Sequence, residues 1–379
     1  MLAEAGLQTM IDPRDAALLA GLVYVSPDEP GIGRSRAGKG FVYKGPDLAR
    51  IADRGVVQRI RSLAVPPAWR NVWICTQENG HIQAVGYDDN GRKQYRYHTR
   101  FRELREGAKF DHMLAFAEAL PALRAQVAAD MKSTGLGRDK VLATVVHLLE
   151  TTMIRVGNRA YAKENKSYGL TTLRGRHVRV EGGELRFHFK GKSGKVWRLG
   201  VRDRRVAKIV KACQELPGQH LFQYLDEDGQ PQAVTSADIN AYLKNASGRD
   251  ITAKDFRTWA GTVLAATALA DAEPAETQAR AKRSLTAVIQ QVSTRLGNTP
   301  TICRKCYIHP EIMNAYLEGD LSLDLGPACD DDDQTCLRRE EAAVLQFLRE
   351  RLTPNRKRLA VVEAPWPKAA RTPAGEPDE

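Results

Sequence analysis

The sequence predicts an α+β protein in which a small β-rich N-terminal domain is followed by a mainly α-helical domain with a small antiparallel sheet. The chain has 379 residues, which is too long for one ordinary core, so two or three domains are expected. Up to about residue 105, short stretches rich in β-branched and aromatic residues alternate with glycine-containing turns, a pattern typical of strands. Beyond that point apolar residues recur at steps of three and four, which indicates amphipathic helices.

These patterns divide the chain into four parts. We expect a flexible arm at residues 1–20, the β-rich N-terminal domain at 21–105, the mainly helical domain at 106–318 and a C-terminal extension at 319–379. In the N-terminal domain the strand pattern covers residues 22–26, 39–45, 71–77, 81–88 and 93–99, and one helix is expected at 51–63. The extension contains an acidic loop, one helix near 339–352 and a Pro-rich end that we expect to be disordered.

The larger domain begins with amphipathic helices at residues 112–120, 123–131 and 138–157, and the third places Arg155 at its C-terminal end, where Gly157 stops the helix. An antiparallel sheet is expected at residues 170–173, 177–181, 185–189 and 196–201. Gly182 and Gly183 close one of its hairpins, and the tip of the next carries three lysines. Further helices are expected at residues 203–215, 236–245, 254–271, 274–295 and 300–307, the last with Thr299 as its N-cap and Pro300 in its first turn.

The charge balance favours a polyanionic partner. Lys and Arg number 57 against 46 acidic residues, a net charge of +11, which fits nucleic acid first and a membrane surface second. No signal peptide and no membrane-spanning apolar run is found, so we expect a cytoplasmic protein whose sparse cysteines are free thiols. Cys303 and Cys306 form a CxxC, but the remaining cysteines lack zinc-site spacing, so no metal site is expected.

Residues 33–40, GRSRAGKG, imitate a phosphate-binding loop. Gly40 stands where that motif needs the Ser or Thr that holds Mg²⁺, and no buried strand precedes the loop, so a nucleotide-binding enzyme is not expected. We interpret this basic, glycine-rich loop, including Lys39, as a contact to a DNA backbone.

Two segments, KDFRTWAGT at residues 254–262 and LGNTPTICRKCYIHP at 296–310, suggest attack by a tyrosine on a phosphodiester. They supply a cation in Arg257, an amide in Asn298 and a phenol in Tyr307. A phenol has a pKa of about 10, so only ~1 in 1,000 is ionised at neutral pH. Fixed arginines stabilise a phenolate and the charge that develops on the phosphoryl oxygens, and a hairpin lysine can protonate the departing oxygen.

The chain resembles the poxvirus-type type IB DNA topoisomerases, particularly their bacterial branch, over roughly residues 33–316. The resemblance lies in GKGFVYKG, RIRSLAVPPAWRNVWIC, GHIQAVGYDDNGRKQYRYHTRFR, IRVGNRAYAKENKSYGLTTLRGRHV, FKGKSGK, KDFRTWAGT and CRKCYIHP. It implies that Tyr307 attacks the scissile phosphate to give a 3′-phosphotyrosyl enzyme, that Arg155 and Arg257 hold the phosphoryl oxygens, and that Lys192 protonates the 5′-oxygen. Lys190 and Lys195 flank Lys192, and the choice among these lysines rests on the resemblance.

The resemblance also implies further DNA contacts and the form of the protein. Lys254, Lys190, Gln94, Tyr95 and Tyr97 are expected near DNA, although packing within the strand is an alternative role for either tyrosine. The family implies a monomeric, C-shaped clamp on double-stranded DNA that relaxes supercoils by strand rotation and religation, in the cytoplasm at the bacterial nucleoid. Because the covalent bond conserves the energy of the phosphodiester, neither ATP nor a metal cofactor is expected.

Asn298 departs from the family, because viral and nuclear enzymes usually have histidine at this position, although bacterial members resemble this chain. Asparagine can donate a hydrogen bond to a phosphoryl oxygen but cannot titrate. We therefore predict that Asn298 stabilises charge and shuttles no proton.

Two alternatives stay open at this stage. A tyrosine site-specific recombinase shares the chemistry and a similar catalytic fold, but usually has a helical N-terminal domain and a histidine-containing box around the second arginine. A non-catalytic DNA-binding protein would tolerate Tyr307→Phe without loss of activity.

Overall fold

The computed structural model describes residues 12–38, 40–89, 91–273, 275–326 and 336–362, including the side chains of all these except residues 106, 108, 109, 111 and 353–362. The chain divides into two compact units, residues 1–115 and 116–379. The boundary lies within one long helix, α3 (Thr99–Lys132). We expected a helix break at Pro121, but the helix continues through it. Proline removes only one backbone donor, and the buried side chains of Phe116, Leu120 and Leu123 hold the flanking turns in place.

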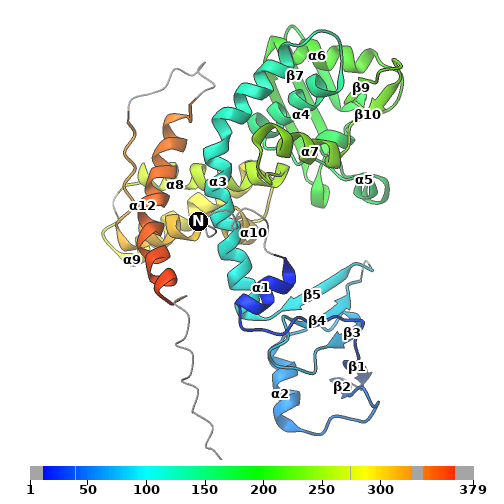
Figure 1. Ribbon diagram of the computed structural model, residues 1–379, viewed down its shortest axis with the longest axis vertical. Coiled ribbons are helices and arrows are strands. Elements are labelled where there is room, and N and C mark those ends of the chain that lie inside the picture. Colours follow the sequence, from blue (N-terminus) through cyan, green and yellow to red (C-terminus); the bar gives the residue numbers. More distant parts are fainter. Residues whose placement is uncertain (1–11, 39, 90, 274, 327–335, 363–379) are drawn as a thin grey trace, which may run out of the picture. The chain divides into compact units, whose positions relative to one another are not determined.

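The first unit contains a five-stranded antiparallel sheet with the strand order β2-β1-β3-β4-β5. Its strands are β1 (Ile32–Ala37), β2 (Gly40–Lys44), β3 (Arg70–Ile74), β4 (Ile82–Tyr87) and β5 (Lys93–Tyr97). Helix α2 (Arg54–Ser62) begins at Asp53, whose side chain accepts from the backbone N–H of Val56. Through Ile60 this helix packs on Ile32 and Ile74 of the sheet (Figure 1).

Two predictions for the first unit are wrong. Residues 22–26 form no strand and make only an isolated bridge between Val23 and Gly80. The basic, glycine-rich segment is not an open loop, because Ile32–Ala37 forms strand β1, which pairs with β2 from Gly33 to Ala37. Its strand character comes from two paired neighbours, β2 and β3, rather than from its own polar composition.

Part of the expected flexible arm is a helix. Helix α1 (Pro13–Leu19) starts at Asp12, whose carboxylate accepts from the backbone N–H of Arg14 at 2.7 Å. Ala16 and Ala17 are fully buried and pack against Leu22 and Phe101. Residues 1–11 lie outside the described residues.

The second unit is mainly helical. Its helices are the C-terminal part of α3, α4 (Arg138–Thr152), α5 (Arg159–Asn165), α6 (Arg204–Glu215), α7 (Ser236–Ser247), α8 (Ala253–Ala270), α9 (Gln278–Leu296), α10 (Pro300–Cys306), α11 (Pro310–Glu318) and α12 (Arg339–Val362). None of the described helices is long and apolar enough to cross a membrane. Figure 1 shows α4, α6 and α7 in one group with the strands of this unit, and α8, α9 and α12 in another.

The small antiparallel sheet of the second unit consists of β6 (Val178–Glu181), β7 (Glu184–Lys190) and β8 (Val196–Arg202), and β9 (Gln223–Leu225) pairs separately with β10 (Pro231–Ala233). Gly182 and Gly183 close the β6–β7 hairpin with positive φ angles of 56° and 89°, as predicted. The α+β class is therefore confirmed. Residues Leu170–Thr172 form a 3-10 turn instead of the expected strand.

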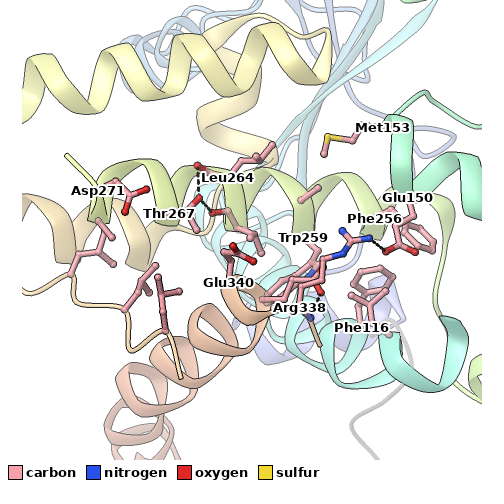
Figure 2. Close-up of a pocket in the computed structure, with 18 of the residues that line it drawn as sticks. Phe116, Glu150, Met153, Phe256, Trp259, Leu264, Thr267, Asp271, Arg338 and Glu340 are labelled. Atoms are coloured by element: carbon pink, nitrogen blue, oxygen red, sulfur yellow. Dashed lines mark hydrogen bonds and ion pairs between the residues drawn. The ribbon is translucent and has the colours of Figure 1, made fainter. Parts of the chain in front are cut away.

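The C-terminal extension folds onto the second unit through α12, where a helix was expected. The half-buried Arg124 of α3 forms ion pairs with Glu150 of α4, at 2.7 Å, and with Glu341 of α12, at 2.8 Å. Arg338 forms a further ion pair with Glu150, at 3.1 Å, and Figure 2 shows these two side chains. The acidic loop at 330–333 and the Pro-rich end from residue 363 lie outside the described residues.

The prediction of free thiols is correct for part of the cysteines. Cys75, Cys213 and Cys303 are free and buried. Cys336 is disulfide-bonded, so the prediction is wrong for this residue.

Candidate active site

Helix α8 brings Arg257 into the interior of the second unit. The helix starts with a reciprocal capping box between Thr252 and Asp255, which places Arg257 in its second turn. The side chain is 3% exposed, and it donates to the backbone carbonyl of Met153 and to that of Leu296, the latter at 2.5 Å. The pKa of Arg257 is lowered to about 10, chiefly because the side chain is buried and also because Arg155 is nearby. Tyr307 offsets part of this decrease in the pKa. The guanidinium is therefore still charged at neutral pH.

Arg155 lies just beyond α4. The helix ends earlier than predicted, at Thr152, because Met153 adopts the left-handed conformation with φ 58° and reverses the chain. The backbone carbonyl of Arg155 accepts from Leu170 N at 2.9 Å, which holds this stretch against the 3-10 turn. Its guanidinium donates to the side-chain oxygen of Asn298 and, at 3.4 Å, to the carbonyl of Gly297. Burial lowers the pKa of Arg155, and the Tyr307 hydroxyl offsets part of that effect.

Tyr307 is the C-cap residue of the short helix α10. As predicted, Thr299 caps the start of α10, and its hydroxyl accepts from the backbone N–H of Ile302. The backbone carbonyl of Tyr307 accepts from the Thr262 hydroxyl at 3.3 Å, so α8 holds the residue from the side. The guanidinium carbon of Arg257 lies 5.3 Å from the centre of the phenol ring. The phenol is thus placed beside two arginines.

A glycine allows this close approach of α8 to Tyr307. A Cβ atom at position 261 would lie 2.5 Å from the backbone oxygen of Tyr307 and 3.2 Å from its Cβ. Only glycine leaves room for that contact, although glycine is unfavourable within a helix. Gly261 was not among the residues predicted for the site, although a glycine in a helix interior, four residues after Arg257, is a signal that could have identified it.

Three consecutive residues at the end of α9 connect these side chains. Leu296 accepts from Arg257, Gly297 accepts from Arg155, and the amide of Asn298 accepts from Arg155 as well. We call residues 296–298 the α9 end. This short stretch leads directly into α10, so the position of Tyr307 and the positions of both guanidinium groups depend on the same piece of backbone.

Two buried donors at this site lack a hydrogen-bond acceptor within the described part of the chain. They are Nε of Arg257 and Nδ2 of Asn298. Buried polar atoms are nearly always satisfied, so a pair of orphan donors calls for an explanation. Positively charged and neutral N–H donors gathered beside a phenol can bind the oxygens of an anionic group such as a phosphodiester.

The structure does not bring Lys192 into contact with the other four predicted residues. Lys192 is exposed at the tip of the β7–β8 hairpin, in the short turn Lys192–Gly194. Its ammonium makes no hydrogen bond or ion pair within the described residues. A residue close to the tip does reach the site, because the ring of Trp197, the second residue of β8, packs on Gly297. A Cβ atom at position 297 would lie 2.6 Å from the indole. Trp197 and Gly297 were not among the residues predicted for the site.

The predicted DNA contacts are spread over both units. In the second unit, Lys254 is exposed in the first turn of α8 and Lys190 is exposed at the end of β7. In the first unit, Tyr95 and Tyr97 are 40% and 44% exposed on the edge strand β5, with their rings stacked 5.7 Å apart.

Gln94 does not share the exposed face of those tyrosines. Neighbouring residues of a strand point to opposite faces of the sheet. Its side-chain amide donates to Asp88 at 3.0 Å. Lys39 lies outside the described residues.

A cavity of about 640 Å³ in the second unit is lined by residues that flank Arg257 in sequence and in space. Figure 2 shows Phe256 and Trp259 of α8, and Met153, which follows α4, among its lining residues. The C-terminal extension also contributes to the lining, with Leu321, Ser322, Leu323, Leu325, Arg338, Glu340 and Glu341. The extension therefore lines the same cavity as the residues that flank Arg257. No group of three His, Cys, Asp or Glu side chains that could hold a metal occurs among the described residues.

Comparisons with known proteins cover both units. Residues 98–321 match the family model described as the catalytic core of eukaryotic DNA topoisomerase I, and residues 40–88 match the N-terminal domain of bacterial DNA topoisomerase IB. The chain is 32% identical over 299 residues to the DNA topoisomerase 1B of Acanthamoeba polyphaga mimivirus, covering 76% of this chain and 87% of the viral protein. It is 23% identical over 234 residues to the DNA topoisomerase 1B of vaccinia virus (strain Copenhagen), covering 60% and 70% of the two chains.

Proposed function

The chain belongs to the type IB DNA topoisomerase family, and from this premise we propose that Tyr307 is the nucleophile with which it relaxes supercoiled double-stranded DNA. The phenol oxygen attacks the scissile phosphorus, the bond to the 5′-oxygen breaks, and a 3′-phosphotyrosyl link forms. The phenolic proton passes to solvent, and Lys192 donates a proton to the departing 5′-oxygen. Rotation of the free strand then releases supercoils, and the 5′-hydroxyl reverses the step.

Arg155, Arg257 and Asn298 bind the non-bridging oxygens of the scissile phosphate in this proposal. Both arginines are anchored by backbone carbonyls of the protein, so they are oriented before DNA arrives and need little reorganisation during the reaction. Asn298 supplies a hydrogen bond and no proton transfer.

The observation that carries the proposal is the pair of orphan donors, Arg257 Nε and Asn298 Nδ2. An unsatisfied buried donor costs about 1–3 kcal/mol. Such a cost is understandable if both atoms receive acceptors from the substrate. A phosphodiester offers two non-bridging oxygens, which fits a site with two orphan donors and two guanidinium groups.

Around this centre we propose that exposed basic and aromatic side chains bind the duplex. Lys254 and Lys190 contact phosphates, and the stacked pair of Tyr95 and Tyr97 contacts the backbone or sugars. We further propose that the enzyme acts as a monomer, in the cytoplasm at the bacterial nucleoid, without a nucleotide or metal cofactor.

The test is relaxation of supercoiled plasmid in EDTA without ATP, with wild type, Tyr307→Phe and Tyr316→Phe. Tyr316 makes a matched control, because its hydroxyl on α11 has no hydrogen-bond partner among the described residues. We expect Tyr307→Phe to bind DNA and relax none of it, and Tyr316→Phe to relax DNA at the wild-type rate. Denatured wild-type reactions should contain DNA linked to residue 307, as identified by peptide mapping. Relaxation by Tyr307→Phe, or a link through another residue, would contradict the proposal.

A further inference from the structure

Trp197 occupies a slot between two glycines. A Cβ atom at position 191, in the hairpin itself, would lie 2.7 Å from the indole nitrogen, and one at position 297, on the α9 end, would lie 2.6 Å from the ring. Side chains at either position would therefore force the indole out. The ring also stacks in parallel on Phe189, its register partner on β7, with an interplanar angle of 1° and centroids 6.2 Å apart.

The slot joins two parts of the proposed site, the β7–β8 hairpin and the α9 end. The β7–β8 hairpin carries Lys192 at its tip, five residues before Trp197. Gly297 lies in the α9 end, where its carbonyl accepts from Arg155 at 3.4 Å. A long hydrogen bond of 3.5 Å from the Lys195 ammonium to the carbonyl of Thr294 also connects the hairpin with α9.

Ordinary core packing does not explain Trp197. The indole is half-buried, and the sheet core on this face is already filled by Leu185, Phe187 and Phe189, which are all buried. Trp197 extends that apolar face beyond the sheet, onto backbone that also holds a guanidinium. A flat, rigid ring with two rotatable bonds is well suited to fix the orientation of a hairpin at small entropic cost.

We propose that Trp197 is a positioning residue, which seats the β7–β8 hairpin on the α9 end and so delivers the Lys192 ammonium to the departing 5′-oxygen. This inference rests on the proposed function. Lys192 is exposed and unrestrained by hydrogen bonds among the described residues, so its reach is set by the hairpin that carries it. General acid catalysis requires hydrogen-bond reach to the leaving atom, and a shift of about 1 Å costs on the order of 10²-fold in rate.

The experiment separates positioning of the acid from damage to the rest of the site. Single-turnover formation of the covalent complex is measured on one duplex with two leaving groups, the native 5′-oxygen and a bridging 5′-sulfur. A thiol has a pKa of about 8.5, far below that of an alcohol, so the sulfur departs without a proton donor. Lys192→Ala defines the loss expected when the acid is removed: slow cleavage with oxygen and near-normal cleavage with sulfur.

We expect Trp197→Ala to behave like Lys192→Ala, with a loss of roughly 10²-fold on the oxygen substrate and less than about threefold on the sulfur substrate. Trp197→Phe keeps a ring in the slot and should recover most of the rate. Lys195→Ala, which removes only the long hydrogen bond, should lose less than Trp197→Ala. Thermal unfolding of each variant confirms that the chain is folded.

Equal losses on both substrates would overturn the inference, because Trp197 would then support the arginines and Tyr307 rather than the acid. An unchanged rate for Trp197→Ala on oxygen would overturn it as well. If wild type formed no covalent complex with either substrate, the proposed function itself would be wrong. If Lys192→Ala showed the sulfur rescue and Trp197→Ala did not, only the role of Trp197 would be lost.

Discussion

Replacing Gly261 by alanine tests whether the contact between α8 and α10 sets the position of the nucleophile. The added methyl group would lie 2.5 Å from the backbone oxygen of Tyr307, about 0.9 Å short of an ordinary contact of 3.4 Å. The obstacle is backbone, which cannot rotate away as a flexible side chain could. Tyr307 must therefore move by most of that distance, and displacement of a reacting group by about 1 Å costs on the order of 10²-fold in rate.

The same substitution should change stability much less than activity. Alanine is favoured over glycine within a helix by about 1 kcal/mol, whereas overpacking of a filled site costs about 1–3 kcal/mol. The expected net effect on the free energy of unfolding is thus between zero and about 2 kcal/mol of destabilisation. Gly261→Ala should remain folded, bind DNA normally and cleave slowly.

The assay is single-turnover formation of the covalent complex, alongside denaturant unfolding. Gly107→Ala is a matched control, because it makes the same change within helix α3 at a position with nothing within 4 Å of the added methyl. We expect this control to cleave at the wild-type rate and to be up to about 1 kcal/mol more stable. Wild-type cleavage by a folded Gly261→Ala would refute the reasoning, since the contact would then not determine where the phenol lies.

Three further predictions concern stability and pH. Glu341→Gln neutralises the buried Glu341, one of two carboxylates that pair with Arg124, and should cost about 2 kcal/mol in urea unfolding. The control Glu340→Gln changes an exposed residue and should stay within about 0.5 kcal/mol of wild type; equal effects would contradict a stabilising role for the pair. Burial, with nearby cations, lowers the pKa of His177 to about 4, so the unfolded chain binds more protons between pH 6.5 and 4. Stability should fall by up to about 3 kcal/mol across that range, and His177→Asn should lack this slope. Asn298→His should add an ionisation near pH 6.5 to the cleavage rate profile; a profile without one would contradict the assignment of Asn298 as a group that only stabilises charge.

Local signals in the sequence were sufficient for many elements of the fold. The alternation of Leu185, Phe187 and Phe189 identified a strand with one buried face, and Gly182 and Gly183 identified its turn. Thr299 marked the start of α10. Each of these signals acts within a few residues, through side-chain period, turn conformation or a cap, so it can be read without knowing the neighbours in space.

Elements defined by distant partners were missed. The polar segment Ile32–Ala37 is a strand because β2 and β3 pair with it. The helix predicted to end at Gly157 stops at Thr152 because Met153 turns left-handed, and residues 170–171 then bond to the carbonyls of 155–156. Such backbone pairings leave no trace in composition or periodicity.

By itself the sequence determined the α+β class, the basic character and, through its motifs, which five residues to examine. Only the tertiary structure decided that Arg155 and Arg257 are both anchored on the α9 end, which contains Asn298 and leads into the helix that carries Tyr307. It also decided that Lys192 stays apart, on a hairpin whose Trp197 packs on Gly297. The physical reason is that backbone carbonyls orient the two arginines, and that Gly261 and Gly297, which have no side chain, allow their neighbours to approach closely. Every residue has a carbonyl, and a glycine shows its purpose only when its neighbours in space are known.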